Sequence, residues 1–122
     1  MKGAFWRLWW RQRNVIRDHA LLKEVVRRII DFTHPDQIIL FGSAARGQLR
    51  PDSDFDLLVV KQGATEPRQL AQLIQTQLFG IPMPVDIIVT TPEDLAASRK
   101  QWWTLLGRVG REGKRLYVNG RS

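Results

Sequence analysis

The sequence predicts an α+β domain, in which a short mixed β-sheet has helices packed on one face. Two observations lead to this fold class. Apolar residues recur at helical spacing in three segments, and short runs rich in branched residues, typical of buried strands, lie between them. The chain has 122 residues, 43% of them hydrophobic, which suits a single compact domain with its own core.

The first half of the domain is expected to form a helix and two strands. Apolar positions at helical spacing predict an amphipathic helix over residues 18–32. Pro35 and Asp36 break this helix, and residues 37–41 are expected to form a short buried strand. A glycine turn and a proline-containing loop then return the chain to a second strand over residues 54–60.

The second half is expected to add two helices and up to two strands. A proline at the first helical position and an apolar stripe predict a helix over residues 67–80, followed by a strand over residues 85–89. A threonine cap followed by proline begins a last helix over residues 92–109, with Trp102 on its core-facing stripe. Residues 115–118 are expected to form a short strand or an extended tail.

The composition limits the partners and the kind of site. There is no cysteine and there are only two histidines, which argues against disulfides, thiolate metal sites and histidine-built zinc sites. Any bound metal should therefore have oxygen ligands. The formal charge of +7 favours an anionic partner, whether a nucleotide, a nucleic acid or an acidic protein surface. No apolar run approaches the roughly 20 residues that span a bilayer, so we expect a soluble, cytoplasmic protein.

Residues 1–17 are predicted to be an N-terminal extension that precedes a single domain over residues 18–122. The extension has basic and aromatic residues but no acidic one. Packing of its aromatic side chains on this domain or on a partner subunit is the favoured interpretation. Nucleic-acid binding and attachment to a membrane surface are the alternatives. The residues in question are Lys2, Phe5, Trp6, Arg7, Trp9, Trp10, Arg11, Arg13 and Arg17.

A turn suited to an anion follows the first strand. Gly42 permits a tight turn, and backbone N–H groups at the start of a helical turn point outward and bind anions. Phosphates can therefore rest against Gly42 and Ser43, within reach of Arg46. On this motif alone, an ordinary strand-to-helix turn is the favoured interpretation.

Three carboxylates accompany the second and third strands. Asp54 and Asp56 emerge on the same side of an extended chain, roughly 7 Å apart. They are either surface residues at a strand end or ligands of a divalent cation. Asp86 lies between Val85 and Ile87, where a carboxylate faces either a cation or a wet edge.

These motifs together resemble the DNA polymerase beta-like nucleotidyltransferase superfamily. The matching segments are Leu40-Phe41-Gly42-Ser43, Ser53-Asp54-Phe55-Asp56-Leu57 and Val85-Asp86-Ile87. The spacing of Gly42-Ser43 and Asp54-x-Asp56, with residues 44–53 between them, is similar to that of the minimal nucleotidyltransferase (MNT) antitoxins of prokaryotic toxin-antitoxin pairs. The resemblance runs from about Leu21 to Tyr117 and implies a small nucleotidyltransferase fold.

The resemblance also implies roles for six residues. Asp54 and Asp56 would hold the nucleotide-bound Mg²⁺ and share a second Mg²⁺, which Asp86 would complete. Asp86 would also orient the acceptor hydroxyl or take its proton. The remaining three residues would bind the β and γ phosphates of ATP, and they are Gly42, Ser43 and Arg46.

The biology implied by the resemblance is that of an antitoxin. Similar proteins pair with an all-helical HEPN-domain toxin and transfer AMP from ATP to one of its tyrosines. The alternatives are a non-catalytic antitoxin that neutralises its partner by binding, and a nucleotidyltransferase acting on a small molecule. Direct nucleic-acid binding through the positive charge is a further alternative, and its affinity would fall steeply with salt.

Overall fold

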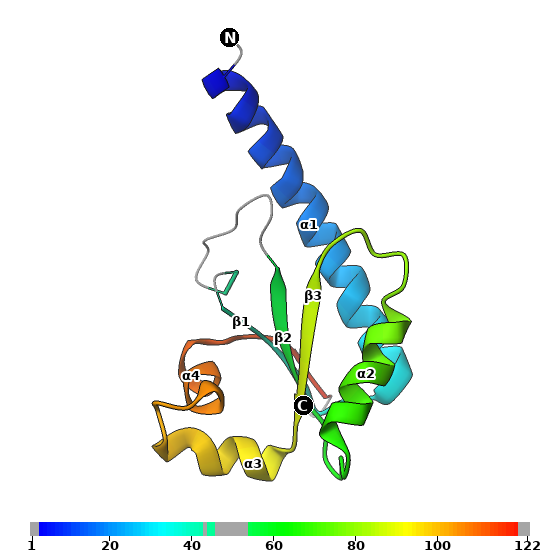
Figure 1. Cartoon of the computed structure of the whole chain (residues 1–122), viewed down its shortest axis with the longest axis vertical. Coiled ribbons are helices and arrows are strands. Elements are labelled where there is room, and N and C mark those ends of the chain that lie inside the picture. The colour runs from blue at the N-terminus through cyan, green and yellow to red at the C-terminus, as the bar shows by residue number, and fades with distance from the viewer. Residues whose placement is uncertain (1–2, 43, 46–53, 120–122) are drawn as a thin grey trace.

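The computed structural model describes residues 3–42, 44–45 and 54–119, with only the backbone described for residues 3–17. Figure 1 shows a sheet flanked by helices, with a long first helix that extends past one end of the sheet. The elements in chain order are α1 (Gly3–Thr33), β1 (Gln37–Phe41), β2 (Phe55–Val60), α2 (Pro67–Gln77), β3 (Val85–Thr90), α3 (Pro92–Ala97), the 3-10 helix η1 (Ser98–Lys100), α4 (Leu105–Glu112) and β4 (Lys114–Val118).

The four strands form one mixed sheet in the order β3-β2-β1-β4. β1 pairs antiparallel with both β2 and β4, whereas β2 and β3 are parallel. The predicted strands therefore match those observed to within a residue or two at each end. Because β1 runs opposite to β2 and β3, the last residue of β1 and the first residues of β2 and β3 meet at the same end of the sheet.

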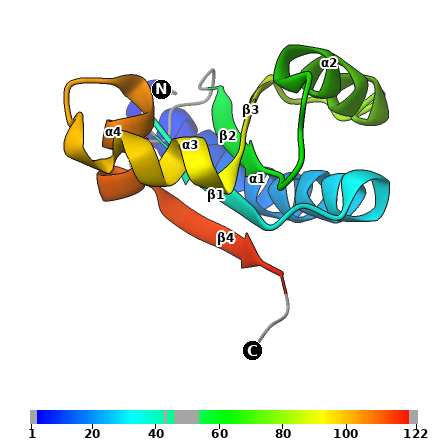
Figure 2. The same ribbon diagram turned by 90° about the horizontal axis from the view of Figure 1, so that it is seen from below.

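Helices cover both faces of this sheet, so the expectation of helices on one face only is wrong. Alternate residues along β1 and β2 belong to two separate apolar clusters, which places the clusters on opposite faces. α1 and α2 pack on one face, while α3 and α4 pack on the other, as Figure 2 shows. β2 is buried at Phe55 and at every position from Leu57 to Val60, as expected of a strand covered on both sides.

α1 is twice as long as the predicted helix over residues 18–32, since it begins at Gly3. Within the predicted part of this helix, Val25 and Ile29 are fully buried. Arg28 connects this helix to the end of α2 by donating to the carbonyl oxygens of Gln77, at 3.2 Å, and Phe79, at 2.9 Å. α2 begins at Pro67 as predicted and ends at Gln77, three residues earlier than expected.

The predicted last helix over residues 92–109 is instead two short helices and a 3-10 turn. Thr91 caps α3 as expected, but a second cap at Thr104 starts α4 afresh. Trp102 lies in the connecting turn and is 60% exposed, so its predicted place in the core is wrong. Trp103 is exposed as predicted. Within the described part of the chain, no helix is long and apolar enough to cross a membrane.

Candidate active site

The predicted carboxylates lie at the end of the sheet where β2 and β3 begin. Asp56 and Asp86 are direct neighbours in the parallel register, each the second residue of its strand. They share a face with Leu58 and Ile88, which is the face that α3 and α4 cover further along the strands. Asp54 immediately precedes β2 and is exposed, as is Asp86, whereas Asp56 is half-buried.

Gly42 lies against the carboxylate of Asp56. It follows β1, whose last residue Phe41 is the antiparallel partner of Asp56. Its φ of +78° is in the left-handed region that favours glycine, and a Cβ built there would lie 2.5 Å from Oδ2 of Asp56. Only a glycine lets the backbone come this close to the carboxylate without displacing it.

Ionisation of Asp56 is disfavoured at this position. The pKa of Asp56 is raised from 3.8, first because the group is partly buried, then by the charge and the hydrogen bond of Asp86, and last by the charge of Asp54. A hydrogen bond between two carboxyl groups requires that one of them donates a proton. Within the described residues, no lysine or arginine forms an ion pair with any of the three.

This arrangement fits a divalent cation that is only partly enclosed by protein. Across the described residues no group of three or more carboxylate or histidine side chains is gathered closely enough to hold a metal. The close pair of Asp56 and Asp86, with Asp54 nearby, instead suits Mg²⁺, which is often bound by one or two carboxylates and completed by water and substrate phosphates. A cation between the carboxylates would also remove the repulsion that raises the pKa of Asp56.

Two of the predicted phosphate-binding residues, Ser43 and Arg46, lie outside the described residues. Their roles remain predictions. The structure brings together the other four predicted residues, namely Gly42, Asp54, Asp56 and Asp86.

A hollow of about 260 Å³ adjoins Gly42 and was not anticipated from the sequence. Leu105, Arg108 and Glu112 of α4 form one wall, because α4 folds back over the end of β1. Gly113, directly after α4, allows this close approach, since a Cβ there would lie 2.5 Å from Cγ2 of Ile39 in β1. The sequence signal that could have predicted a separate α4 is the N-cap residue Thr104. Its hydroxyl oxygen accepts from the Gly107 N–H at 3.1 Å, and a new helix begins there.

Comparisons with known proteins identify the fold. The profile of the nucleotidyltransferase domain matches residues 20–105, which is most of the chain. The chain is also similar to the crystal structure of a candidate nucleotidyltransferase from Sulfolobus solfataricus, with 25% sequence identity and a TM-score of 0.62 over 87% of this chain and 85% of that chain. No curated protein matches. The predicted α+β nucleotidyltransferase fold is thus confirmed, and the chain belongs to the nucleotidyltransferase domain family, whose members generally use a nucleoside triphosphate and a divalent metal.

Proposed function

We propose that this protein is the antitoxin of a HEPN/MNT-type pair and that it transfers AMP from ATP to a tyrosine hydroxyl of its partner toxin. The observation that carries the catalytic part is the pairing of Asp56 with Asp86 directly beside Gly42, in a domain of the nucleotidyltransferase family. The antitoxin part rests on the resemblance of the Gly42-Ser43 and Asp54-x-Asp56 spacing to the minimal nucleotidyltransferases.

In this proposal each residue has a defined task. Asp54, Asp56 and Asp86 would hold Mg²⁺, which would supply charge stabilisation for the oxygens that enter and leave the α-phosphorus. Gly42 and Ser43 present backbone N–H groups to the β and γ phosphates, with Arg46 assisting. Asp86, exposed at the start of β3, accepts the proton of the acceptor hydroxyl. The acceptor oxygen then bonds to the α-phosphorus, the bond to the β-phosphate bridge breaks, and pyrophosphate leaves.

An exposed aromatic turn supports a macromolecular acceptor. Trp102 and Trp103 are 60% and 66% exposed and pack edge to face, with ring centroids 6.1 Å apart. The guanidinium of Arg111 lies 5.9 Å from the centre of the Trp102 ring, within the range of a cation–π contact. Exposed tryptophans beside an arginine are typical of the residues that dominate protein–protein binding.

Transfer can be tested directly with Mg²⁺ and ATP labelled at the α-phosphate, with and without the product of the neighbouring gene. The proposal expects label on that product. Asp54→Asn and Asp56→Asn should each reduce transfer by at least about 100-fold, because they remove charge that stabilises the transition state. Asp94→Asn is the matched control, since Asp94 is exposed in the first turn of α3, and it should leave transfer unchanged.

The outcomes separate the proposal from its alternatives. A stable complex with no label on the partner would support an antitoxin that acts by binding alone. Label on a small hydroxylated molecule, but never on the partner, would support a small-molecule nucleotidyltransferase. Full activity of Asp56→Asn with Mg²⁺ would refute the assigned site even if the partner is modified.

A further inference from the structure

The hollow of about 260 Å³ beside Gly42 lies on the same face of the sheet as the carboxylates. Phe41, which lines it, pairs with Asp56, and Asp56 pairs with Asp86, so the three side chains form one row across β1, β2 and β3. Adjacent strands of a sheet are about 4.8 Å apart. The hollow is therefore one strand away from Asp56 and two strands away from Asp86, on the Gly42 side of this pair.

The lining of this hollow combines apolar side chains with two charges. Phe41, Leu105 and Val109 are the apolar residues. Arg108 and Glu112, both on α4 and both exposed, are the charged ones. Among the described residues of the lining, Arg108 is the only basic one. Apolar neighbours keep water away from its charge, which strengthens the attraction of that charge for an anion.

The guanidinium of Arg108 has no partner within the part of the chain that the structure describes. No ion pair or hydrogen bond connects it to Glu112, although a spacing of four residues along a helix allows one. Arg28, in contrast, pairs with Glu24 and donates to two carbonyl oxygens. Arg108 is therefore available to a ligand, and the planar fork of an arginine matches the oxygens of a phosphate.

A nucleoside triphosphate brings several negative charges to an end of the sheet that already carries three carboxylates. Mg²⁺ held by these carboxylates would offset part of the repulsion. The terminal phosphates, which leave as pyrophosphate, gain further charge during the reaction and are stabilised by a cation placed beside them in advance. Arg108 is the cation that the described lining offers next to Gly42.

We propose that this hollow is the subsite of the terminal phosphates of the triphosphate and that Arg108 binds the γ-phosphate there. The inference rests on the proposed function for one point, the place of the triphosphate at the Gly42 turn. Asp86 lies on the acceptor side of Asp56 and the hollow lies on the other side, so the triphosphate runs from Asp56 toward Arg108. α4 is then part of the nucleotide site as well as a cover for the sheet.

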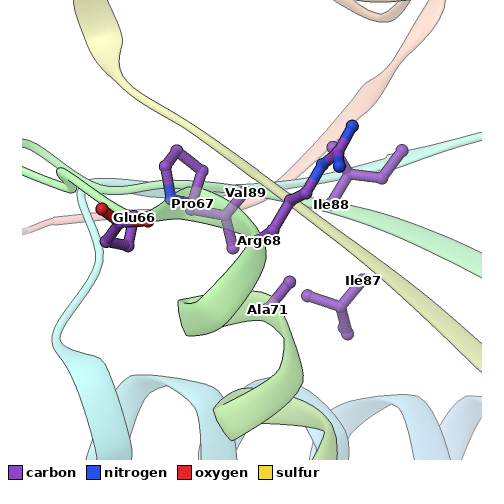
Figure 3. Close-up of a pocket in the computed structure, with 7 residues that line it drawn as sticks. All are labelled: Glu66, Pro67, Arg68, Ala71, Ile87, Ile88 and Val89. Carbon is purple, nitrogen blue, oxygen red and sulfur yellow. The ribbon is translucent and has the colours of Figure 1, made fainter.

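A second cavity, of about 560 Å³, supplies a matched control. It lies between the first turns of α2 and β3, and Figure 3 shows Arg68 in its wall, near Ile88. None of the three carboxylates lines it, and α2 packs on the face of the sheet opposite to α4. Arg68 is exposed like Arg108, so its replacement removes the same charge from a different hollow.

Titration calorimetry of the full chain with Mg²⁺ tests the subsite without a partner protein. The ligands are ATP, AMP and inorganic tripolyphosphate. Arg108→Gln should weaken binding of ATP and tripolyphosphate by at least about tenfold, the usual effect of losing a charged hydrogen bond, and that of AMP by less than about twofold. Arg108→Lys should recover part of the loss, because it restores the charge but not the fork. Arg68→Gln should leave all three affinities unchanged, and none of the variants should change the Tm.

The outcomes separate this subsite from the proposed function. Equal weakening of AMP and ATP by Arg108→Gln, with tripolyphosphate unchanged, would place Arg108 at the nucleoside and overturn the proposal, as would unchanged affinity for all three ligands. Equal weakening by Arg68→Gln would reduce the effect to net charge and also overturn it. A chain that binds neither ATP nor tripolyphosphate would refute the proposed function together with the subsite. Binding that depends on Arg108, in a chain that never labels its partner, would refute the transfer but support the subsite.

Discussion

Gly42 is the position in the candidate site where a side chain is least tolerated. We expect Gly42→Ala to lower the free energy of unfolding by roughly 1 kcal/mol or more, because the added Cβ strains a φ of +78° and displaces the Asp56 carboxylate. Thermal unfolding followed by circular dichroism measures the loss, and transfer activity should fall with it.

Gly63 provides the control for this substitution. Its φ is +81°, yet a Cβ there would have nothing within 4 Å. Gly63→Ala therefore carries the cost of the backbone angle without the contact. If both variants lose the same stability and both keep transfer activity, then the close approach of Gly42 to Asp56 contributes nothing.

Asp56 should make the metal-free protein less stable as the pH rises. Its pKa is raised in the folded protein by burial and by Asp86 and Asp54. The stability that the protonated acid contributes is therefore complete below pH 3.8 and is lost as the pH rises through the raised pKa. Asp56→Asn removes that loss, so without metal at neutral pH its Tm should exceed that of the original chain by a few degrees.

Addition of Mg²⁺ completes this experiment. The ion should raise the Tm of the original chain, because it binds the folded state and offsets the repulsion among the carboxylates. It should raise the Tm of Asp56→Asn much less. An Asn variant that unfolds at a lower temperature than the original chain in the absence of metal would contradict the electrostatic explanation.

At the scale of elements, the strands were the most predictable part of the fold. Each is a short run of branched apolar residues between turn residues, and the expected strand over 37–41 has the observed bounds. The sequence did contain a signal that helices cover both faces of the sheet, but the prediction did not use it. A strand with one wet face alternates apolar and polar residues, but Leu57 to Val60 is apolar throughout and buried throughout.

The prediction of a single last helix over residues 92–109 was wrong because it relied on apolar periodicity alone, which joined two separate helices. Leu95 and Val109 do face the same core, which supports the predicted stripe at its ends. Between them, the chain leaves helical geometry after Lys100 and restarts at Thr104. A stripe of apolar residues cannot distinguish one helix from two that pack on the same face, whereas a cap residue followed by a new apolar pair can.

Thr104 is therefore expected to matter for stability and for the site. Its side chain accepts from Gly107 N–H and its hydroxyl donates to the Gln101 carbonyl oxygen, at 3.1 and 2.7 Å. Thr104→Ala should cost roughly 1 kcal/mol, the usual effect of losing an N-cap, as measured by urea unfolding.

Thr76→Ala is the control for this cap. The Thr76 hydroxyl donates to the Leu73 carbonyl oxygen within α2, and Ala has the higher helix propensity, so the stability should change little. If Thr104→Ala is as mild as Thr76→Ala, the cap does not determine where α4 begins.

At the scale of the whole molecule, the candidate site was predictable in its residues but not in its surroundings. Asp56 and Asp86 are thirty residues apart, and only the parallel pairing of β2 with β3 makes them neighbours. The resemblance to nucleotidyltransferases implied that these carboxylates share a site, but the sequence predicted no pairing of these two strands. The hollow beside Gly42 depends on α4 folding back over β1, a tertiary contact for which Arg108 carries no local signal.

The predicted division of the chain at residue 18 falls within α1 and can be tested there. Among the side chains that the structure describes, those that α1 contributes to the core are Leu22, Val25, Val26, Ile29 and Ile30. A chain that begins at Asp18 should therefore keep cooperative unfolding, with a Tm within a few degrees of that of the full chain. Scanning calorimetry of the two chains measures this. A shortened chain that unfolds without cooperativity would show that residues 1–17 belong to the domain.

The same shortened chain tests whether the extension serves the partner. Residues 1–17 supply five basic residues and no acidic ones to a chain of net charge +7. If they bind an acidic surface, their removal should weaken binding of the neighbouring gene's product and flatten its dependence on salt, because fewer charge pairs are left to screen. Titration calorimetry at low and physiological ionic strength measures both effects. Equal affinity and equal salt dependence for the two chains would place the docking surface elsewhere, and the exposed turn at Trp102 and Trp103 would be tested next.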